Sequence, residues 1–340
     1  MKGKTIGILT SGGDAPGMNA TIRAIVLAAH KFDHQCIGFM HGYNGLIHQQ
    51  HKTLVPDDVA NVIHKGGTIL KSARCPEMLT EQGITQAVQT LTQLEIDVLI
   101  VIGGDGSFNG MLAIEKLWQG QLIGLPGTID NDIDGTDFTI GFSTAINTAI
   151  EAIDKIRDTA DAFDRVFVIE LMGRQSGHIA FNVGIACGAE QIISFENFQQ
   201  LQKQQKLNAI IEDISAHRSD AHKSYLIVLA ENLWPGGAHE LANQLKQQAN
   251  IDCGLCILGH IQRGGSPVAK DRILATRLGV AAVQALNDGK TGVMLGELKN
   301  DIVEVPLSLA VCHTKHVADN LVSAHENILA LAAQHHKTVL

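Results

Sequence analysis

The residues best suited to chemistry in this sequence lie in a glycine-rich stretch. VIGGDGSFNG, residues 101–110, places Asp105 among four glycines, directly after an apolar run at residues 98–102. Glycine leaves backbone N–H groups accessible, and such groups attract anions where a helix begins beside them. The Asp105 carboxylate would repel a phosphate unless a cation such as Mg²⁺ bridges the two. We therefore expect a phosphate site that uses a metal ion; the alternative is a tight turn between a strand and a helix.

The spacing of these glycines argues against two common nucleotide motifs. Gly104 and Gly106 are followed by a glycine only at Gly110, which does not fit the GxGxxG pattern, and the chain contains no GxxxxGK[ST] sequence. A helix is expected to begin after the glycines, at Met111. A second turn of the same kind, TSGGDAPGMN at residues 10–19, follows the first predicted strand. Two such turns indicate more than one phosphate group.

An acidic loop follows another predicted strand. PGTIDNDIDGTD, residues 126–137, carries four aspartates within eight residues: Asp130, Asp132, Asp134 and Asp137. Carboxylates this close repel one another unless a metal, an arginine or proton transfer stabilises them, although a solvated acidic loop remains the simpler interpretation. Phosphoryl transfer requires a base for a hydroxyl proton, a carboxylate for Mg²⁺ and donors to the phosphoryl oxygens. Asp130 and Asp132 can divide the first two roles, and Thr128 can take the third.

Cationic side chains lie at strand ends or in glycine turns elsewhere in the chain. Arg74 lies in KSARCPE, Arg165 and Arg174 flank the apolar run of DRVFVIELMGRQSG, and His260 and Arg263 lie in GHIQRGGSP. A single arginine of this kind could simply be a surface residue, but an arginine that binds a phosphate is expected at these positions. The four arginines together favour an anionic substrate.

Alternating strands and helices must position these residues. Strand-like apolar runs occupy residues 5–9, 35–39, 97–103, 121–125, 165–171, 224–230 and 255–259. Residues 143–160 repeat apolar side chains every three or four positions and predict a helix, which we interpret as a crossing into a second domain. The pattern predicts an α/β fold with mainly parallel sheets covered on both faces. In such folds ligands bind after the carboxyl ends of strands, where all the motifs above lie.

Composition narrows the classes of function. The chain has 340 residues, 45% of them hydrophobic, and a net charge of −9, which argues against a general role in binding nucleic acid. We find no signal peptide and no apolar run long enough to span a membrane, so we expect a cytoplasmic protein with reduced cysteines. Cys253 and Cys256 form a CxxC pair that we interpret as core residues of a strand. CHTKH at 312–316 is interpreted as a solvated helix face, and the glutamine-rich stretch 197–208 as a polar surface helix.

Taken in order, the motifs resemble those of the bacterial ATP-dependent 6-phosphofructokinase family. The similarity rests on LTSGGDAPGMN, VIGGDGS, PGTIDNDI, MGR and LGHIQRGGSP, and runs from residue 5 to about residue 290. The resemblance implies a glycolytic kinase that forms a homotetramer. Each subunit would have two similar three-layer α/β domains with mainly parallel sheets and the active site in the cleft between them. The nucleotide domain would comprise residues 1–141 plus about 261–305, and the sugar-phosphate domain residues 142–260 plus about 306–325.

The resemblance also implies roles for individual residues. Asp130 would be the general base, Thr128 and Arg174 would stabilise the transferring group, and Asp105 and Asp132 would hold Mg²⁺. The ATP site would include Gly13, Tyr43, Arg74, Cys75, Gly104, Asp105, Gly106 and Ser107. Fructose 6-phosphate would contact Thr128, Ile129, Asp130, Met172, Gly173, Arg174, Glu231, His260 and Arg263, with Arg165 reaching over from a neighbouring subunit.

Pyrophosphate-dependent relatives carry an acid and a lysine where this chain has Gly106 and Gly127, so the resemblance favours ATP as donor.

In two respects the chain departs from the family. The family arginine six residues before His260, which grips the 6-phosphate from an adjacent subunit, is Gly254 here. Losing one such contact would weaken sugar binding by about 1.5 to 3 kcal/mol, roughly ten- to hundredfold.

The second departure concerns regulation by ADP or phosphoenolpyruvate. Of the residues that the family uses to bind these effectors between subunits, Arg23, Arg157 and Glu190 persist, whereas other expected basic positions are lost. We therefore expect weak or altered allostery.

Two alternatives to the leading function remain open: a kinase for another phosphosugar such as tagatose 6-phosphate, and a non-catalytic sensor of a sugar phosphate or nucleotide.

Overall fold

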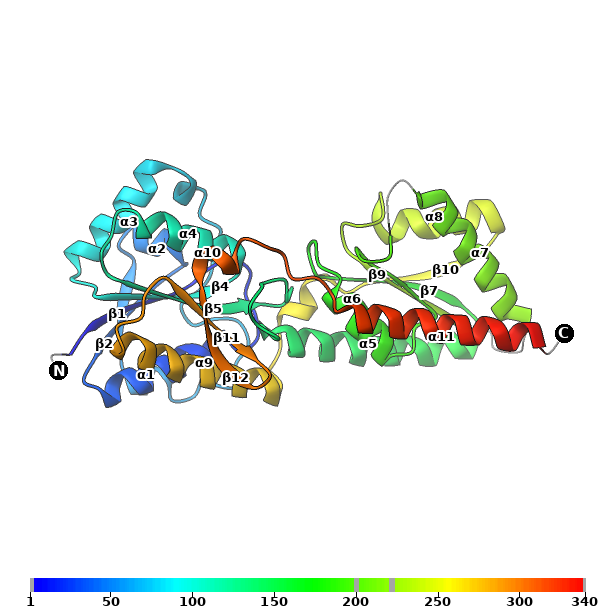
Figure 1. The fold of residues 1–340 in the computed structure, drawn as a ribbon. Helices are drawn as coiled ribbons and strands as arrows, with labels where there is room; N and C mark the ends of the chain where they lie inside the picture. Colours follow the sequence, from blue (N-terminus) through cyan, green and yellow to red (C-terminus); the bar gives the residue numbers. More distant parts are fainter. Residues whose placement is uncertain (1–2, 199–201, 220–223, 339–340) are drawn as a thin grey trace. The chain divides into compact units, whose positions relative to one another are not determined.

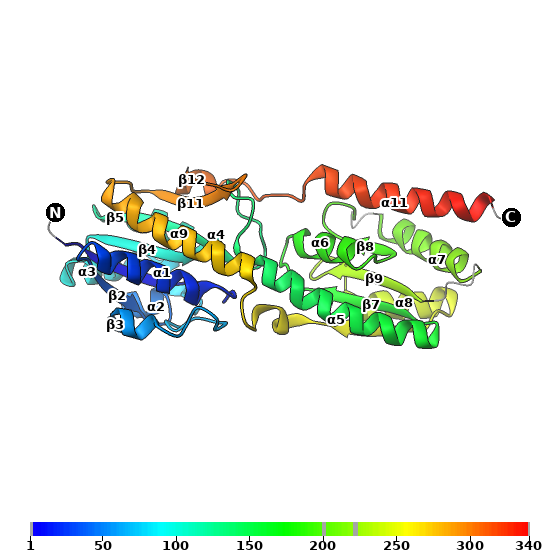
Figure 2. The same cartoon turned by 90° about the horizontal axis from the view of Figure 1, so that it is seen from below.

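The computed structural model describes residues 3–198, 202–219 and 224–338, which divide into two compact units (Figures 1 and 2). Unit 1 comprises the chain up to Ile129 together with Ile133–Thr144 and Arg263–Lys315. Unit 2 comprises Asp130–Asp132, Ala145–Gln262 and the chain from His316 onward. The chain therefore passes between the units several times, and two of these passages lie within the acidic loop.

Unit 1 is built on a mostly parallel sheet, which has eight strands among the described residues. Its order is β12-β11-β5-β4-β1-β2-β3, with β6 paired to β5. The β2–β3 and β11–β12 pairs at its two edges are antiparallel, and the other pairs are parallel. The strands are β1 (Thr5–Thr10), β2 (Gln35–Phe39), β3 (His51–Leu54), β4 (Val98–Gly103), β5 (Gln121–Thr128), β6 (Ile140–Gly141), β11 (Val293–Leu298) and β12 (Asp301–Pro306).

Helices cover both faces of this sheet, so its central strand β4 is buried along its whole length. On one face α1 (Met18–Lys31) packs against α9 (Ala269–Asn287), and the other face carries α2 (Tyr43–Ile47), α3 (Glu81–Gln93), α4 (Asp105–Glu115) and α10 (Leu307–Ala310) (Figure 1). Gly279 permits the close approach of α1 and α9, because a Cβ atom at this position would lie 2.7 Å from the Cβ of Ala24. Short 3₁₀ helices at Pro56–Val59 and Pro76–Leu79 complete the unit.

Unit 2 contains a parallel sheet, which has four strands among the described residues, in the order β10-β7-β9-β8. The strands are β7 (Val166–Leu171), β8 (Gln191–Ile193), β9 (Tyr225–Ala230) and β10 (Cys253–Ile257). One face carries α7 (Lys203–Ser219) and α8 (Gly237–Ala249) around the buried Trp234; the other carries α5 (Phe142–Phe163) and α6 (His178–Ala186) (Figures 1 and 2). The C-terminal helix α11 (Asp319–Thr338) packs against α6. A 3₁₀ helix, Gly259–Arg263, leads back into unit 1.

This architecture confirms the predicted α/β class with mainly parallel sheets. The predicted helix at 143–160 is α5, and the predicted strands correspond to β1, β2, β4, β5, β7, β9 and β10 within a few residues. None of the helices that the structure describes combines the length and the apolarity needed to cross a membrane.

Four local predictions are wrong. The helix after the first glycine stretch begins at Asp105, because burial of Phe108 and packing of Gly110 against Tyr43 outweigh the low helix propensity of glycine. Residues 312–316 are not helical: Thr314 forms an isolated bridge with Ile133.

The other two errors concern unit 2. The predicted polar helix at 197–208 begins only at Lys203 and buries Leu207, while residues 199–201 lie outside the described part of the chain. Cys253 and Cys256 are half-buried rather than core residues, because β10 is an edge strand.

Candidate active site

In unit 1 the first glycine turn follows β1 and is held by neighbouring backbone. The Ser11 N–H donates to the carbonyl of Ile102 at 3.0 Å, which ties the turn to the end of β4. The Ser72 hydroxyl donates to the carbonyl of Gly12 at 2.6 Å. Two loops far apart in the sequence are therefore fixed side by side at the carboxyl ends of the strands, where ligands bind in such sheets.

The second glycine turn ends β4 and opens α4. A Cβ atom at Gly103 would lie 2.4 Å from Ser107 Oγ, whereas one at Gly106 would meet no atom within 4 Å. Asp105 and Gly106 are exposed, so the first turn of α4 is accessible to a ligand, while the N–H of Ser107 donates to the carbonyl of Gly104 at 3.0 Å. This is the arrangement that binds phosphate.

Three further residues predicted for the nucleotide lie close to this turn or in the loop beside it. The buried Tyr43 hydroxyl donates to the carbonyl of Ser107 at 2.6 Å, and burial raises the pKa of Tyr43, so the phenol stays protonated. Arg74 is exposed, and its carbonyl accepts from Asn44 Nδ2 at 3.2 Å. Burial also raises the pKa of Cys75, which keeps that thiol neutral. Tyr43 thus stabilises the first turn of α4 from its buried side.

Unit 1 also carries two residues predicted to act on the transferred group or the sugar. Thr128 ends β5, and its carbonyl accepts from Thr139 Oγ1 at 2.6 Å. Arg263 lies against the first glycine turn, because its Nη1 donates to the carbonyl of Asp14 at 3.2 Å. Gly13 leaves room for this contact, because a Cβ atom there would lie 2.4 Å from Arg263 Nη1.

In unit 2 the aspartate segment and the MGR turn are bound together. The Ser176 hydroxyl donates to the carbonyl of Asp130 at 2.8 Å. The backbone N–H groups of Gly173 and Arg174 both donate to Glu231 Oε1, at 3.1 and 2.7 Å. Arg174 adopts a left-handed conformation with φ of 59°, which a non-glycine residue keeps only where the surroundings hold it. Glu231 therefore fixes the shape of the turn after β7.

Sequence reasoning missed two residues that build this turn. Gln262 is fully buried, and its Oε1 accepts from the N–H of Met172 at 2.8 Å. Ser176 makes the contact to Asp130. Both lie inside quoted motifs, GHIQRGGSP and MGRQSG, but their side chains carry no charge that would have singled them out.

Three further residues lie at different places around the unit 2 sheet: Arg165 precedes β7, Gly254 lies on the edge strand β10, and His260 follows β10. His260 and Arg165 are exposed, and the Arg165 guanidinium lies 4.8 Å from the centre of the Phe163 ring. Gly254 on β10 pairs with Phe167 on β7, and a Cβ atom at Gly254 would lie 2.4 Å from a carbon of that ring. The aromatic ring thus covers the position where the family carries an arginine.

The residues predicted for Mg²⁺ provide oxygen ligands, which this ion prefers. Asp105 is exposed at the start of α4 in unit 1, and Asp132 is half-buried in unit 2. Among the residues the structure describes, no group of three or more potential ligand side chains is close enough to form a complete protein cage. One or two carboxylates completed by phosphate oxygens are the usual arrangement for this ion, and the residues present fit it.

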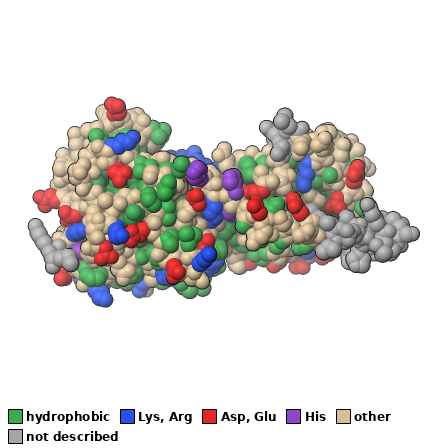
Figure 3. Space-filling view, in the orientation of Figure 1, with side chains coloured by type: hydrophobic (Ala, Val, Ile, Leu, Met, Phe, Trp, Pro, Cys, Tyr) green, Lys and Arg blue, Asp and Glu red, His purple; other side chains and the backbone are tan. Residues whose placement is uncertain are grey.

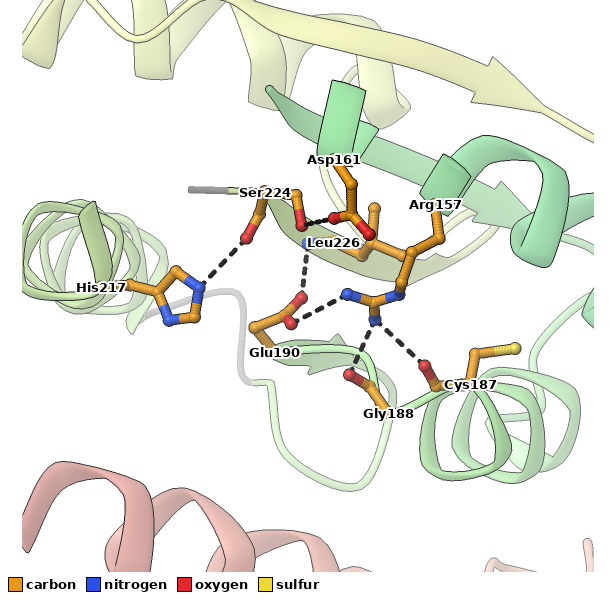
Figure 4. A network of polar contacts seen from close by, with 8 residues as sticks. All are labelled: Arg157, Asp161, Cys187, Gly188, Glu190, His217, Ser224 and Leu226. Carbon is orange, nitrogen blue, oxygen red and sulfur yellow. Dashed lines mark hydrogen bonds and ion pairs between the residues drawn. The ribbon is translucent and has the colours of Figure 1, made fainter. Parts of the chain in front are cut away.

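Two of the three residues predicted for an effector form an internal network in unit 2 (Figure 4). Arg157 Nη1 lies 3.1 Å from Glu190 Oε1, and Arg157 Nη2 donates to the carbonyls of Cys187 and Gly188 at 3.0 and 2.8 Å. Glu190 Oε2 accepts from the N–H of Leu226 at 2.7 Å. Both charged groups are thus engaged inside the unit. The third, Arg23, lies on α1 in unit 1 and is half-buried.

The surface seen in Figure 3 intersperses acidic and basic side chains over both units. An extended basic face of the kind that binds nucleic acid is absent from this view. The observation agrees with the net charge of −9.

Comparison with known proteins decides the family. The family model described as phosphofructokinase matches residues 5–286. The chain belongs to the phosphofructokinase family. Among curated relatives, it is 49% identical over 314 residues to ATP-dependent 6-phosphofructokinase 1 of Thermus thermophilus, covering 92% of this chain and 96% of that protein. It is 44% identical over 318 residues to ATP-dependent 6-phosphofructokinase of Bacillus subtilis, covering 93% and 96%.

Solved structures of the family agree with this fold. The phosphofructokinase structure from Saccharomyces cerevisiae matches with a TM-score of 0.82 and 34% identity, over 96% of this chain and 47% of the yeast chain. A pyrophosphate-dependent phosphofructokinase from Marinobacter aquaeolei matches with a TM-score of 0.81 at 23% identity, which supports the fold alone.

Proposed function

We propose that this chain transfers the γ-phosphoryl group of ATP to the 1-hydroxyl of fructose 6-phosphate, giving fructose 1,6-bisphosphate and ADP. The observation that carries the proposal is the 49% identity, over 92% of the chain, to a protein named ATP-dependent 6-phosphofructokinase 1. The two glycine turns, the aspartate segment and the MGR turn supply the groups that such a transfer needs.

The residues of unit 1 would bind the nucleotide. The exposed start of α4 at Asp105 and Gly106, together with the turn at Gly13, would receive the phosphates. Asp105 and Asp132 would hold Mg²⁺, which when bound neutralises phosphate charge. Arg74 and Cys75 would border the same nucleotide, with Tyr43 supporting the turn.

The residues of unit 2, with Thr128 and Arg263, would serve the acceptor and the transfer. Asp130 would take the proton of the 1-hydroxyl, while Thr128 and Arg174 would stabilise the charge on the transferring group. Glu231 would keep the Arg174 turn in shape through its two N–H contacts. The remaining acceptor contacts would come from Ile129, Met172, Gly173, His260, Arg263 and, in a homotetramer, Arg165 of a neighbouring subunit.

The decisive variant is Asp130→Ser, which removes the base. We expect ATP binding to persist and steady-state formation of ADP with Mg²⁺, ATP and fructose 6-phosphate to fall by at least roughly a hundredfold. Asp134→Ser is the matched control, because Asp134 belongs to the same loop, is exposed and has no assigned role in the transfer. Turnover unchanged in Asp130→Ser would refute the mechanism.

A kinase for another phosphosugar is the second candidate, and the Phe167 ring over Gly254 is the observation that favours it. Parallel assays with tagatose 6-phosphate as acceptor and pyrophosphate as donor distinguish the candidates. Saturable turnover with fructose 6-phosphate and ATP supports the proposal. Turnover only with tagatose 6-phosphate supports the second candidate, and nucleotide binding without turnover on any acceptor indicates a sensor.

A further inference from the structure

A buried carboxylate outside the predicted site joins several of its loops. Asp271 lies in the first turn of α9 and has no exposed surface. Its Oδ1 accepts from the N–H of Gly141 at 3.0 Å, and its Oδ2 accepts from the N–H and the hydroxyl of Thr144 at 2.7 and 2.5 Å. The Thr144 hydroxyl in turn accepts from the N–H of Val268 at 3.0 Å. Asp271 thus satisfies N–H groups at the beginning of α5 that the helix itself cannot satisfy.

The first glycine turn also meets this cluster. A Cβ atom at Gly17 would lie 2.6 Å from Ile140 and 3.6 Å from the carbonyl oxygen of Asp271. One at Gly141 would lie 2.6 Å from the Cβ of Ala15. With φ of 116° and 104°, Gly17 and Gly141 need glycine for their backbone conformation as well. The turn at 10–19, residues 140–144 after the acidic loop and the start of α9 are therefore packed around one carboxylate.

The three segments carry residues of the proposed reaction. The turn holds Gly13, residues 140–144 follow the acidic loop that contains Thr128, and Arg263 precedes α9 on the chain. Thr139 and Arg263 each extend the connection, through hydrogen bonds to the carbonyls of Thr128 and Asp14. Thr144 is also the last residue of unit 1 before α5 continues into unit 2, and Arg263 is the first after the chain returns.

We infer that Asp271 is a positioning residue for phosphoryl transfer, which holds these three segments in register through Gly141 and Thr144. The inference rests on the proposed function. Burial raises the pKa of Asp271, and the N–H and O–H donors around the carboxylate act in the opposite direction. A misplacement of reacting groups by about 1 Å can cost roughly a hundredfold in rate, so a residue far from the chemistry can limit it.

The test compares Asp271→Asn with a half-buried carboxylate control in unit 2. Asparagine keeps the shape of the side chain but presents an N–H₂ group to a backbone donor. Asp213→Asn is the control, because Asp213 also accepts from two side chains, Tyr225 Oη and Gln191 Nε2, and has no assigned role. Assays are run well below the unfolding midpoint of each variant. We expect kcat to fall roughly ten- to hundredfold in Asp271→Asn, with a smaller change in the KM for ATP, and kcat of Asp213→Asn to stay at the wild-type level.

Variants of Thr144 provide a conservative rescue. Thr144→Ser keeps the hydroxyl between Asp271 and Val268, and we expect it to retain kcat. Thr144→Val removes the hydroxyl at nearly constant volume, and we expect it to behave like Asp271→Asn. Equal losses in the serine and valine variants would mean that Thr144 acts by packing alone and would overturn the inference.

Hydrogen exchange gives a readout that does not depend on activity. We expect faster exchange of the Gly141 and Thr144 amides in Asp271→Asn than in Asp213→Asn. Exchange of these amides at the wild-type rate in Asp271→Asn would overturn the inference. A kcat of Asp271→Asn equal to that of an active wild type would overturn it too. A wild-type chain without turnover on fructose 6-phosphate and ATP would instead contradict the proposed function, so the two failures are distinguishable.

Discussion

At the scale of single residues, we expect the choice of phosphoryl donor to depend on Gly106. This residue lies in the first turn of α4, and a side chain there would meet no atom within 4 Å. We expect Gly106→Asp to fold with an unchanged or higher unfolding midpoint, since an acid near a helix N-terminus is favourable and glycine in a helix is not. Repulsion from ATP should nevertheless raise the KM for ATP by roughly tenfold or more, because two charges about 4 Å apart repel by about 1 to 4 kcal/mol.

Gly106→Asn is the control for this prediction, because it adds the same volume without the charge. Steady-state kinetics with varied ATP measure both variants. Equal KM values for the aspartate and asparagine variants would show that size, and not charge, acts at this position.

Gly254 offers a second test at the scale of single residues, because a side chain introduced there would meet a neighbouring residue. A Cβ atom there would overlap the ring of Phe167 on the paired strand. We expect Gly254→Arg alone to destabilise the fold by about 1 to 3 kcal/mol, as overpacked substitutions do, and Phe167→Ala to relieve much of that cost in the double variant. Only the double variant should then lower the KM for fructose 6-phosphate, by roughly tenfold.

Denaturant unfolding and acceptor kinetics on all four members of this cycle measure the coupling. Additive stability changes would contradict the predicted overlap. Phe167→Ala alone is the control for the loss of the aromatic ring. A KM that stays high in the double variant would show that the arginine does not reach the acceptor from this position.

At the scale of elements, buried strands were predictable and the start of α4 was not. The run at residues 98–102 is apolar on both faces because helices cover both faces of β4. It can therefore be recognised as a buried strand from its own residues alone. The start of α4 at Asp105 depends on tertiary contacts, the burial of Phe108 and the approach of Tyr43 to Gly110, which override the local propensity of glycine. Residues beyond 291 formed no recognisable pattern, yet they fold as a hairpin and two helices.

The site was predictable to a similar degree. Charged candidates such as Asp105 and Arg174 could be proposed from the sequence because phosphate chemistry requires their charge. Gln262 and Ser176 could not, because their neutral side chains act only through a turn whose shape depends on the fold. The partner of Gly254 was equally hidden: nothing in the sequence indicates that Phe167 lies opposite it.

The network on α5, β8 and β9 leads to a prediction about regulation. Glu190 contacts both Arg157 and the Leu226 N–H, so an anionic effector would have to displace an ion pair that is only about a quarter exposed (Figure 4). We expect ADP or phosphoenolpyruvate to shift the half-saturating concentration of fructose 6-phosphate by less than roughly a factor of five, below the range of typical allosteric coupling. Substrate saturation curves with and without each effector measure this shift, and a strongly displaced or sigmoidal curve would contradict the prediction.

At the scale of the whole molecule, we expect a histidine of the C-terminal helix α11 to make the free energy of unfolding depend on pH. His325 on α11 is 4% exposed, and its Nε2 has no hydrogen-bond partner among the described residues. Its ring lies edge-on to Phe181 of α6, with centroids 6.2 Å apart. Burial, and then the charge of Lys206 on α7, lower the pKa of His325 below its ordinary value of 6.5, while Glu326 acts in the opposite direction.

The sign of the effect follows from proton linkage. Because the pKa of His325 is lower in the folded state, the unfolded chain binds more protons in the interval below pH 6.5, and the free energy of unfolding contributed by this group rises with pH there. The contribution is complete above pH 6.5 and is lost as the pH falls toward the folded-state pKa. We expect His325→Phe to flatten the dependence of the unfolding free energy on pH between about 5 and 7, measured by urea titration at several pH values. Phe181→Leu keeps the imidazole and should retain the slope of the wild type; if His325→Phe retained it too, the acid sensitivity would arise elsewhere in the molecule.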